Sequence, residues 1–151
     1  MIAVVDYKKG NLLSVERGLR FVGAPDALII ADPAEIARAQ AVVLPGVGAF
    51  ADAAASMREL GQMEPVRNAI VAGVPFLGIC LGFQLMYEGG AEGAPAGDDE
   101  VSSHKVSGLA VLPGVVDRMP HVDARGTFYK VPHVGWNTIE LATNDCPLFA
   151  D

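Results

Sequence analysis

The chain has 151 residues, enough for one domain with a substantial core, and 51% of them are apolar against 19% charged. This balance excludes a disordered chain. A net charge of -7 without any basic run argues against nucleic acid and anionic membrane surfaces as partners. Two cysteines in a core-sized chain indicate reduced thiols. Because the N-terminus shows no signal-peptide pattern, we expect a cytoplasmic protein.

Apolar strands alternate with helical segments over the first part of the chain. Strands are expected at residues 2–5, 27–31, 41–44 and 76–79. Helices are expected after Asn11 as N-cap, after Asp32, over residues 51–60 and 64–72, and from 83 to 88. This alternation predicts an α/β fold with a doubly wound, mostly parallel sheet and right-handed crossovers.

The pattern changes after Glu88. Residues 89–100 are rich in glycine, alanine and acidic residues, which indicates a mobile loop. Residues 109–119 and 127–141 read as two antiparallel strands joined by a turn near 120–126. We therefore expect an antiparallel flap on the main sheet, within a single domain that covers residues 1–151.

Cys80 lies between Gly78 and Gly82, where an apolar strand runs into a helix. A sharp strand-to-helix turn presents its central residue at the rim of a sheet, and small neighbours let the backbone make the turn. The first N–H groups of the helix would favour a thiolate, which makes Cys80 a candidate nucleophile. Inert packing is the competing interpretation, because free cysteines are often buried.

A thiolate that attacks an acyl carbon generates an oxyanion, which needs fixed N–H donors. The N–H of Leu81 is one candidate, and the 45–48 loop is the other. In that loop Gly46 and Gly48 flank Val47 and allow its peptide to reorient. A plain strand-ending turn would explain the same glycines.

A catalytic cysteine also uses a base, which is usually a histidine. The histidines are His104, His121 and His133. His121 precedes Asp123 by two residues, but both fall in a predicted turn where solvated polar residues are expected. The sequence places none of the three as the base, and it indicates no metal site.

Four motifs resemble the glutamine amidotransferase subunits of imidazole glycerol phosphate synthases, which are class I, triad-type glutaminases. They are Val5-Asp6-Tyr7 with Gly10-Asn11-Leu12, then Leu44 to Phe50, Gly78 to Leu85, and Lys130 to Asn137. The first and last narrow the resemblance from the superfamily to this subunit.

The resemblance implies a role for each motif. Cys80 would attack the side-chain amide of glutamine, form a thioester and release ammonia. Gly46, Val47, Gly48, Leu81 and Gln84 would form the oxyanion and substrate site, with the N–H groups of Val47 and Leu81 as donors. No cofactor is implied.

The resemblance also implies a heterodimer with a cyclase subunit, a (β/α)8 barrel that receives the ammonia. Asn11, His133, Trp136 and Asn137 would lie at the docking face or along the ammonia route. A buried aromatic residue at an interface fits Trp136.

One departure from the family concerns the catalytic base. The family carries its histidine and glutamate in a His-Pro-Glu segment near the C-terminus, and no such segment occurs in these 151 residues. The chain is therefore expected to lack the final strands and to be inactive by itself. The alternatives are a non-catalytic synthase-docking module, a cysteine hydrolase of the α/β-hydrolase type, and another class I glutaminase subunit.

Overall fold

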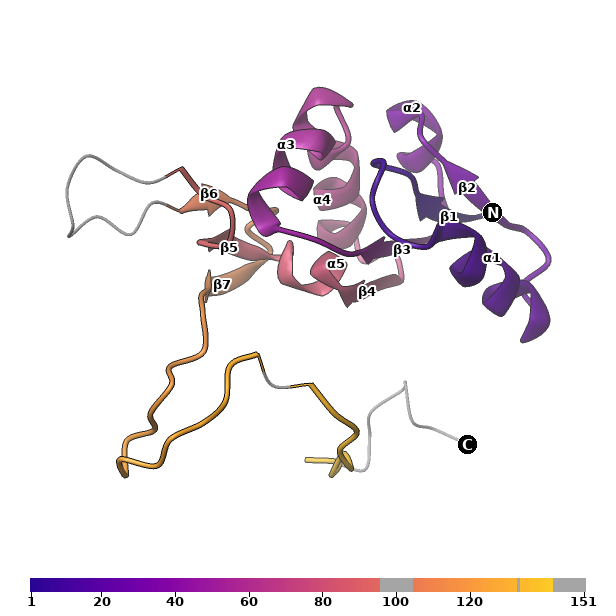
Figure 1. Cartoon of the computed structure of the whole chain (residues 1–151). Helices are drawn as coiled ribbons and strands as arrows, with labels where there is room; N and C mark the ends of the chain where they lie inside the picture. The colour runs from indigo at the N-terminus through magenta and orange to yellow at the C-terminus, as the bar shows by residue number, and fades with distance from the viewer. Residues whose placement is uncertain (96–104, 133, 143–151) are drawn as a thin grey trace. The chain divides into compact units, whose positions relative to one another are not determined.

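The computed structural model describes residues 1–95, 105–132 and 134–142. They fall into two compact units, Met1–Arg118 and Met119–Asp151, which are treated separately below (Figure 1). Cys146, His104 and His133 lie outside the described residues, as do residues 96–100 of the predicted 89–100 loop.

The first unit contains a four-stranded sheet in the order β2-β1-β3-β4. Its strands are β1 (Ile2–Val5), β2 (Ala27–Ile30), β3 (Ala41–Gly46) and β4 (Phe76–Cys80). All three pairings are parallel, so the predicted parallel sheet is confirmed. β3 continues two residues beyond its predicted end, because its pairing with β4 extends to Gly46 opposite Cys80.

Helices cover the sheet unequally. They are α1 (Leu12–Phe21), α2 (Pro33–Ile36), α3 (Phe50–Glu59), α4 (Met63–Val71) and α5 (Leu81–Gln84). Figure 1 shows α1 on the other side of the strands from α3 and α4. The buried core joins the sheet to α2, α3, α4 and α5, whereas α1 contributes no fully buried residue. Asn11 caps α1 as predicted, since its side chain accepts a hydrogen bond from the Ser14 N–H at 3.3 Å.

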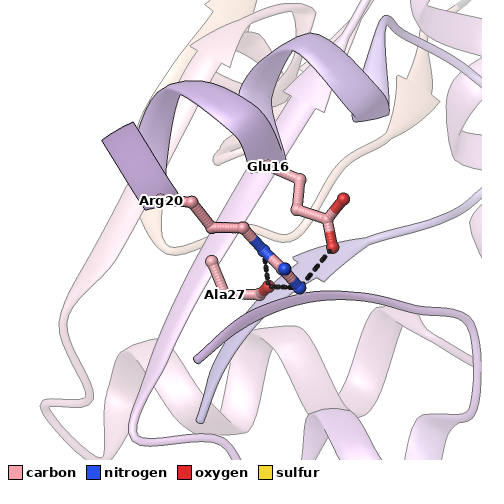
Figure 2. A network of polar contacts seen from close by, with 3 residues as sticks. All are labelled: Glu16, Arg20 and Ala27. Atoms are coloured by element: carbon pink, nitrogen blue, oxygen red, sulfur yellow. Dashed lines mark hydrogen bonds and ion pairs between the residues drawn. The ribbon is translucent and has the colours of Figure 1, made fainter. Parts of the chain in front are cut away.

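The C-terminal end of α1 is tied to the start of β2 by Arg20. Its guanidinium donates from Nε and Nη2 to the carbonyl of Ala27, at 3.2 and 3.1 Å, and pairs with Glu16 one turn earlier at 3.1 Å (Figure 2). A cation in the last turn also favours the helix dipole. This network helps to hold α1, although its face is only partly buried.

A second, three-stranded sheet of the first unit has the order β6-β5-β7. Its strands are β5 (Tyr87–Gly90), β6 (Val106–Ser107) and β7 (Leu112–Val116). β5 is antiparallel to β6 and parallel to β7, so only part of this sheet matches the predicted antiparallel flap.

The helix predicted over residues 83–88 is wrong beyond Gln84, and Gly89 and Gly90 belong to a strand rather than to a mobile loop. The glycines permit a close approach: a methyl group on Gly90 would lie 2.4 Å from the ring of Phe50. The chain therefore leaves α5 after one turn and packs extended against α3.

The hairpin predicted from residues 109–119 and 127–141 is also wrong. Among the described residues from 127 onward no strand forms, and a single antiparallel bridge joins Val122 to Phe128. The apolar alternation that suggested a strand has no buried face, since Phe128 and Ile139 are each 72% exposed. A half-buried strand needs a surface to bury its apolar side, and the described residues of the second unit offer none.

Gln62 joins the ends of two neighbouring strands, β1 and β2. It is fully buried, and its Nε2 donates to the carbonyls of Asp6 and Ala31, both at 2.8 Å. These two carbonyls follow β1 and β2 directly. The amide therefore fixes the start of the loop that leaves β1.

Replacing Gln62 with leucine is expected to lower the free energy of unfolding by about 2 kcal/mol, because two partly buried hydrogen bonds, to the carbonyls of Asp6 and Ala31, are lost. Urea denaturation followed by circular dichroism measures this change. Gln40→Leu, at an exposed position, is the control and should stay within about 0.5 kcal/mol of the parent chain. Equal stability of the two variants would contradict the role assigned to Gln62.

Candidate active site at the end of β4

Cys80 is the last residue of β4 and the N-cap of α5. Its backbone has φ 54° and ψ -114°, a conformation that side-chain-bearing residues rarely adopt, and its side chain is exposed. Such strain costs on the order of 1–3 kcal/mol and persists where the surrounding structure enforces it. The packing interpretation of Cys80 is therefore wrong, and the thiol stands open at the strand-to-helix turn.

The flanking glycines act through close contacts rather than through unusual backbone angles. A methyl group on Gly82 would lie 1.7 Å from the carbonyl oxygen of Leu44. One on Gly78 would lie 2.7 Å from Cα of Phe83. The first turn of α5 thus lies directly on β3 and β4, and it is this packing that forces Cys80 into its strained conformation.

α5 is a single turn, so no long dipole faces Cys80. The contribution of this helix to a thiolate or an oxyanion comes from its unpaired first-turn N–H groups, starting with Leu81. The Leu81 side chain is buried, which fixes the position of that N–H. Gln84 ends the helix in a half-buried position, on the same element as the predicted oxyanion donor.

The 45–48 loop lies beside Cys80 because Gly46 pairs with Cys80 in the β3–β4 register. Val47 is 62% exposed, and Gly48 has φ 103° with open space where a side chain would be. Gly46 has no such space, since a methyl group on it would lie 2.2 Å from the hydroxyl of Tyr7. The register therefore brings together the elements that carry the two predicted N–H donors.

Tyr7 also lies at the candidate site, although it stood in the first family motif without a predicted role. Its side chain is fully buried, and its hydroxyl has no hydrogen-bond partner in the described part of the chain. Burial raises the pKa of this phenol well above its usual value, and the negative charge of Cys80 raises it further. The sequence did carry a signal for this residue: Tyr7 is a large polar aromatic residue just after a buried strand and beside a glycine-containing loop.

A hollow of about 410 Å³ opens next to the loop, lined by Asn11, Ser14, Val15, Pro45, Gly46, Val47 and Ile79. It joins the N-terminus of α1 to the loop. Asn11, predicted for the partner face, thus lies close to Val47. Cys80 does not line this hollow.

His121 and Asp123 belong to the second unit and form a local turn there. Asp123 accepts hydrogen bonds from the N–H groups of Thr127 and Arg125, both at 2.8 Å, and these bonds, the first above all, lower the pKa of its carboxyl. His121 stacks on Phe128. This supports the interpretation of the pair as polar turn residues. Within the described ranges, no three residues of the metal-binding types come together.

Two further predicted interface residues lie in the second unit. Trp136 is fully exposed, with a relative accessibility of 104%. Asn137 is described and makes a polar interaction, whereas His133 lies outside the described residues. The positions of these residues relative to Cys80 stay predictions.

Comparison with known proteins decides the family. Residues 3–138 match the family described as glutamine amidotransferase class-I. The chain belongs to the class I glutamine amidotransferase family. A solved glutamine amidotransferase shares the fold with a TM-score of 0.59 over 78% of this chain and 57% of that one, at 20% identity.

Curated relatives of this amidotransferase chain are named imidazole glycerol phosphate synthase subunit HisH. The protein of Synechococcus elongatus is 44% identical over 148 residues, and that of Desulfitobacterium hafniense is 44% identical over 139. These alignments cover 98% and 92% of this chain but 61% and 58% of the relatives, so the chain spans about three fifths of their length. The resemblance found from the motifs is confirmed. No helix in the described part of the chain is long and apolar enough to cross a membrane.

Proposed function

We propose that residues 1–151 belong to one glutaminase domain of a cytoplasmic imidazole glycerol phosphate synthase. Its partner would be a cyclase with a (β/α)8 barrel. The observation that carries the proposal is the exposed Cys80 in a strained conformation, paired in register with Gly46. Unusual backbone strain in a nucleophile position is typical of catalytic turns. The HisH relatives supply the substrate class.

The proposed chemistry uses Cys80 as nucleophile. Its sulfur attacks the side-chain amide carbon of glutamine, and a carbon–sulfur bond forms as the carbon–nitrogen bond breaks and ammonia leaves. The N–H groups of Val47 and Leu81 stabilise the oxyanion of the intermediate. Gly48 and Gln84 help to hold the glutamine, and water then hydrolyses the thioester to glutamate.

The partner is proposed to dock where Asn11, His133, Trp136 and Asn137 meet it and to take up the ammonia. Two observations support this. The Trp136 side chain is fully exposed, and large aromatics of this kind serve as anchors in protein interfaces. The hollow beside Asn11 and Val47 also connects the N-terminus of α1 with the proposed oxyanion loop.

A diazoketone analogue of glutamine tests the nucleophile and the substrate together. We expect a single adduct on Cys80, none on Cys146, and slower labelling when glutamine is added, because the reagent and glutamine compete for one site. Intact-mass and peptide mass spectrometry measure the adduct. Cys80→Ala, which should take up no label, is the control.

Labelling of both cysteines at similar rates, without protection by glutamine, would contradict the proposal. Such a result would favour a non-catalytic docking module. Protection by a different amide substrate and not by glutamine would instead point to a cysteine hydrolase of another specificity.

A further inference from the structure

Tyr7 lies beside the proposed oxyanion loop at Gly46, while its own side chain is closed to substrate. The ring is fully buried, and its hydroxyl lies 2.2 Å from the position that a methyl group on Gly46 would take. That position is also 2.9 Å from Cβ of Leu81 and 3.0 Å from the N atom of Gly82. The Cα of Gly46 thus faces both the Tyr7 hydroxyl and the first turn of α5.

Two helices hold the backbone around Tyr7. The Ser56 hydroxyl, from α3, donates to the Tyr7 carbonyl at 2.6 Å. The Gln62 amide donates to the neighbouring Asp6 carbonyl at 2.8 Å. The position of the phenol is therefore fixed independently of the 45–48 loop, as a preorganised group requires.

The hydroxyl has no hydrogen-bond partner among the described residues, which is rare for a buried polar group. It keeps its proton at neutral pH, because burial and the charge of Cys80 both raise the pKa of the phenol. The Tyr7 hydroxyl is therefore a constant hydrogen-bond donor beside the Gly46–Val47 peptide, and the acceptor that this peptide offers is the Gly46 carbonyl. Gly46 has no side chain and Gly48 has open space around it, so the peptide between Gly46 and Val47 can rotate.

We propose that Tyr7 is a positioning residue for the oxyanion donors: its hydroxyl donates to the Gly46 carbonyl when the Gly46–Val47 peptide turns the Val47 N–H toward the acyl oxygen at Cys80. This inference rests on the proposed function and concerns the same site. Tyr7 touches no substrate. It acts by holding one donor in place before negative charge develops, which is how such donors lower a barrier.

Two reactions of the same sulfur separate this role from plain packing. With p-nitrophenyl acetate, Cys80 attacks the carbonyl carbon through an oxyanion, a thioester forms and p-nitrophenolate leaves. With iodoacetamide, the sulfur displaces iodide from a saturated carbon and no oxyanion forms. In Tyr7→Phe we expect acylation to slow by about tenfold, while alkylation changes by less than about twofold, since only the first reaction uses the donors.

Three controls accompany this measurement. Cys80→Ala gives the background of both reactions. Tyr87→Phe removes another phenol near α5, whose ring meets Phe83 edge-on at 5.6 Å, and should change neither rate. The melting temperature of Tyr7→Phe should equal or exceed that of the parent chain, because the hydroxyl has no partner in this structure.

If Tyr7→Phe changed acylation and alkylation by the same factor, or changed neither, the inference would be overturned. Failure of Tyr7→Phe to fold would overturn it as well. The test is independent of glutamine. A chain in which Tyr7→Phe slows acylation selectively, but in which glutamine does not protect Cys80 from the diazoketone, would contradict the proposed function and retain the role of Tyr7.

Discussion

Glutamine hydrolysis by residues 1–151 with the proposed cyclase partner is expected to be at least about 100-fold slower than by HisH of Synechococcus elongatus, because the base that the family resemblance implies does not occur in these residues. The amide nitrogen must gain a proton to leave as ammonia. The family resemblance assigns that transfer to a His-Pro-Glu segment, which this sequence does not contain. Ammonia release in a coupled assay, with both proteins at equal concentration, measures the difference.

Labelling of Cys80 by the diazoketone should persist in the same preparation. This separates a missing base from a misfolded site. Cys80→Ala supplies the background rate of ammonia release. Turnover within about tenfold of the relative would show that a base lies within these residues, and alanine replacement of His104, His121 and His133 in turn would then identify it.

Replacing Gly82 with alanine is expected to lower the free energy of unfolding by about 3 kcal/mol or more, at the upper end of the usual cost of overpacking. The new methyl group would lie 1.7 Å from the carbonyl oxygen of Leu44. Both groups belong to the backbone contact between α5 and β3, so neither can move without displacing the turn at Cys80. Urea denaturation measures the loss, and diazoketone labelling should disappear with it.

Gly18→Ala is the matched control, because Gly18 also lies within a helix, α1, and a methyl group there meets nothing within 4 Å. This variant is expected to gain about 0.5–1 kcal/mol, since alanine restricts the unfolded chain and favours the helix. If the free energy of unfolding falls in Gly82→Ala and rises in Gly18→Ala, steric contact is the cause of the loss. A Gly82→Ala chain as stable as the parent would refute the close packing of α5 on β3.

The parallel sheet could be predicted because its strands are short apolar runs with clear ends. The run from Ile2 to Val5 is apolar and mostly β-branched, and its last three residues are buried; the alternation with helical segments leaves few other arrangements. The Cys80 turn was likewise visible from its two glycines. The physical role of these glycines could not be predicted. A sequence shows that a small residue stands at a position, but it does not show which neighbouring atoms exclude a larger one. Only the structure identifies the Leu44 carbonyl and the Phe83 backbone as those atoms.

The errors share a cause, which is dependence on distant contacts. Gly89 and Gly90 form a strand because residues far away in sequence pack against them, Val106 against Gly89 and Phe50 against Gly90. The described residues after 127 alternate like a strand, but their apolar side chains, such as Phe128 and Ile139, are exposed. Tyr7 is a related case: its place after a buried strand and beside a glycine loop was a signal, but its contact with Gly46, far away in sequence, could not be predicted.

Within the described part of the chain, β4 pairs on one side only, with β3. Separation of these two strands would move Cys80 away from Gly46 while β1, β2 and β3 stayed together. Local openings of this kind require less free energy than global unfolding. We therefore expect the fraction of molecules competent for acylation of Cys80 to depend on how often β4 separates from β3, a quantity that a denaturation midpoint does not report.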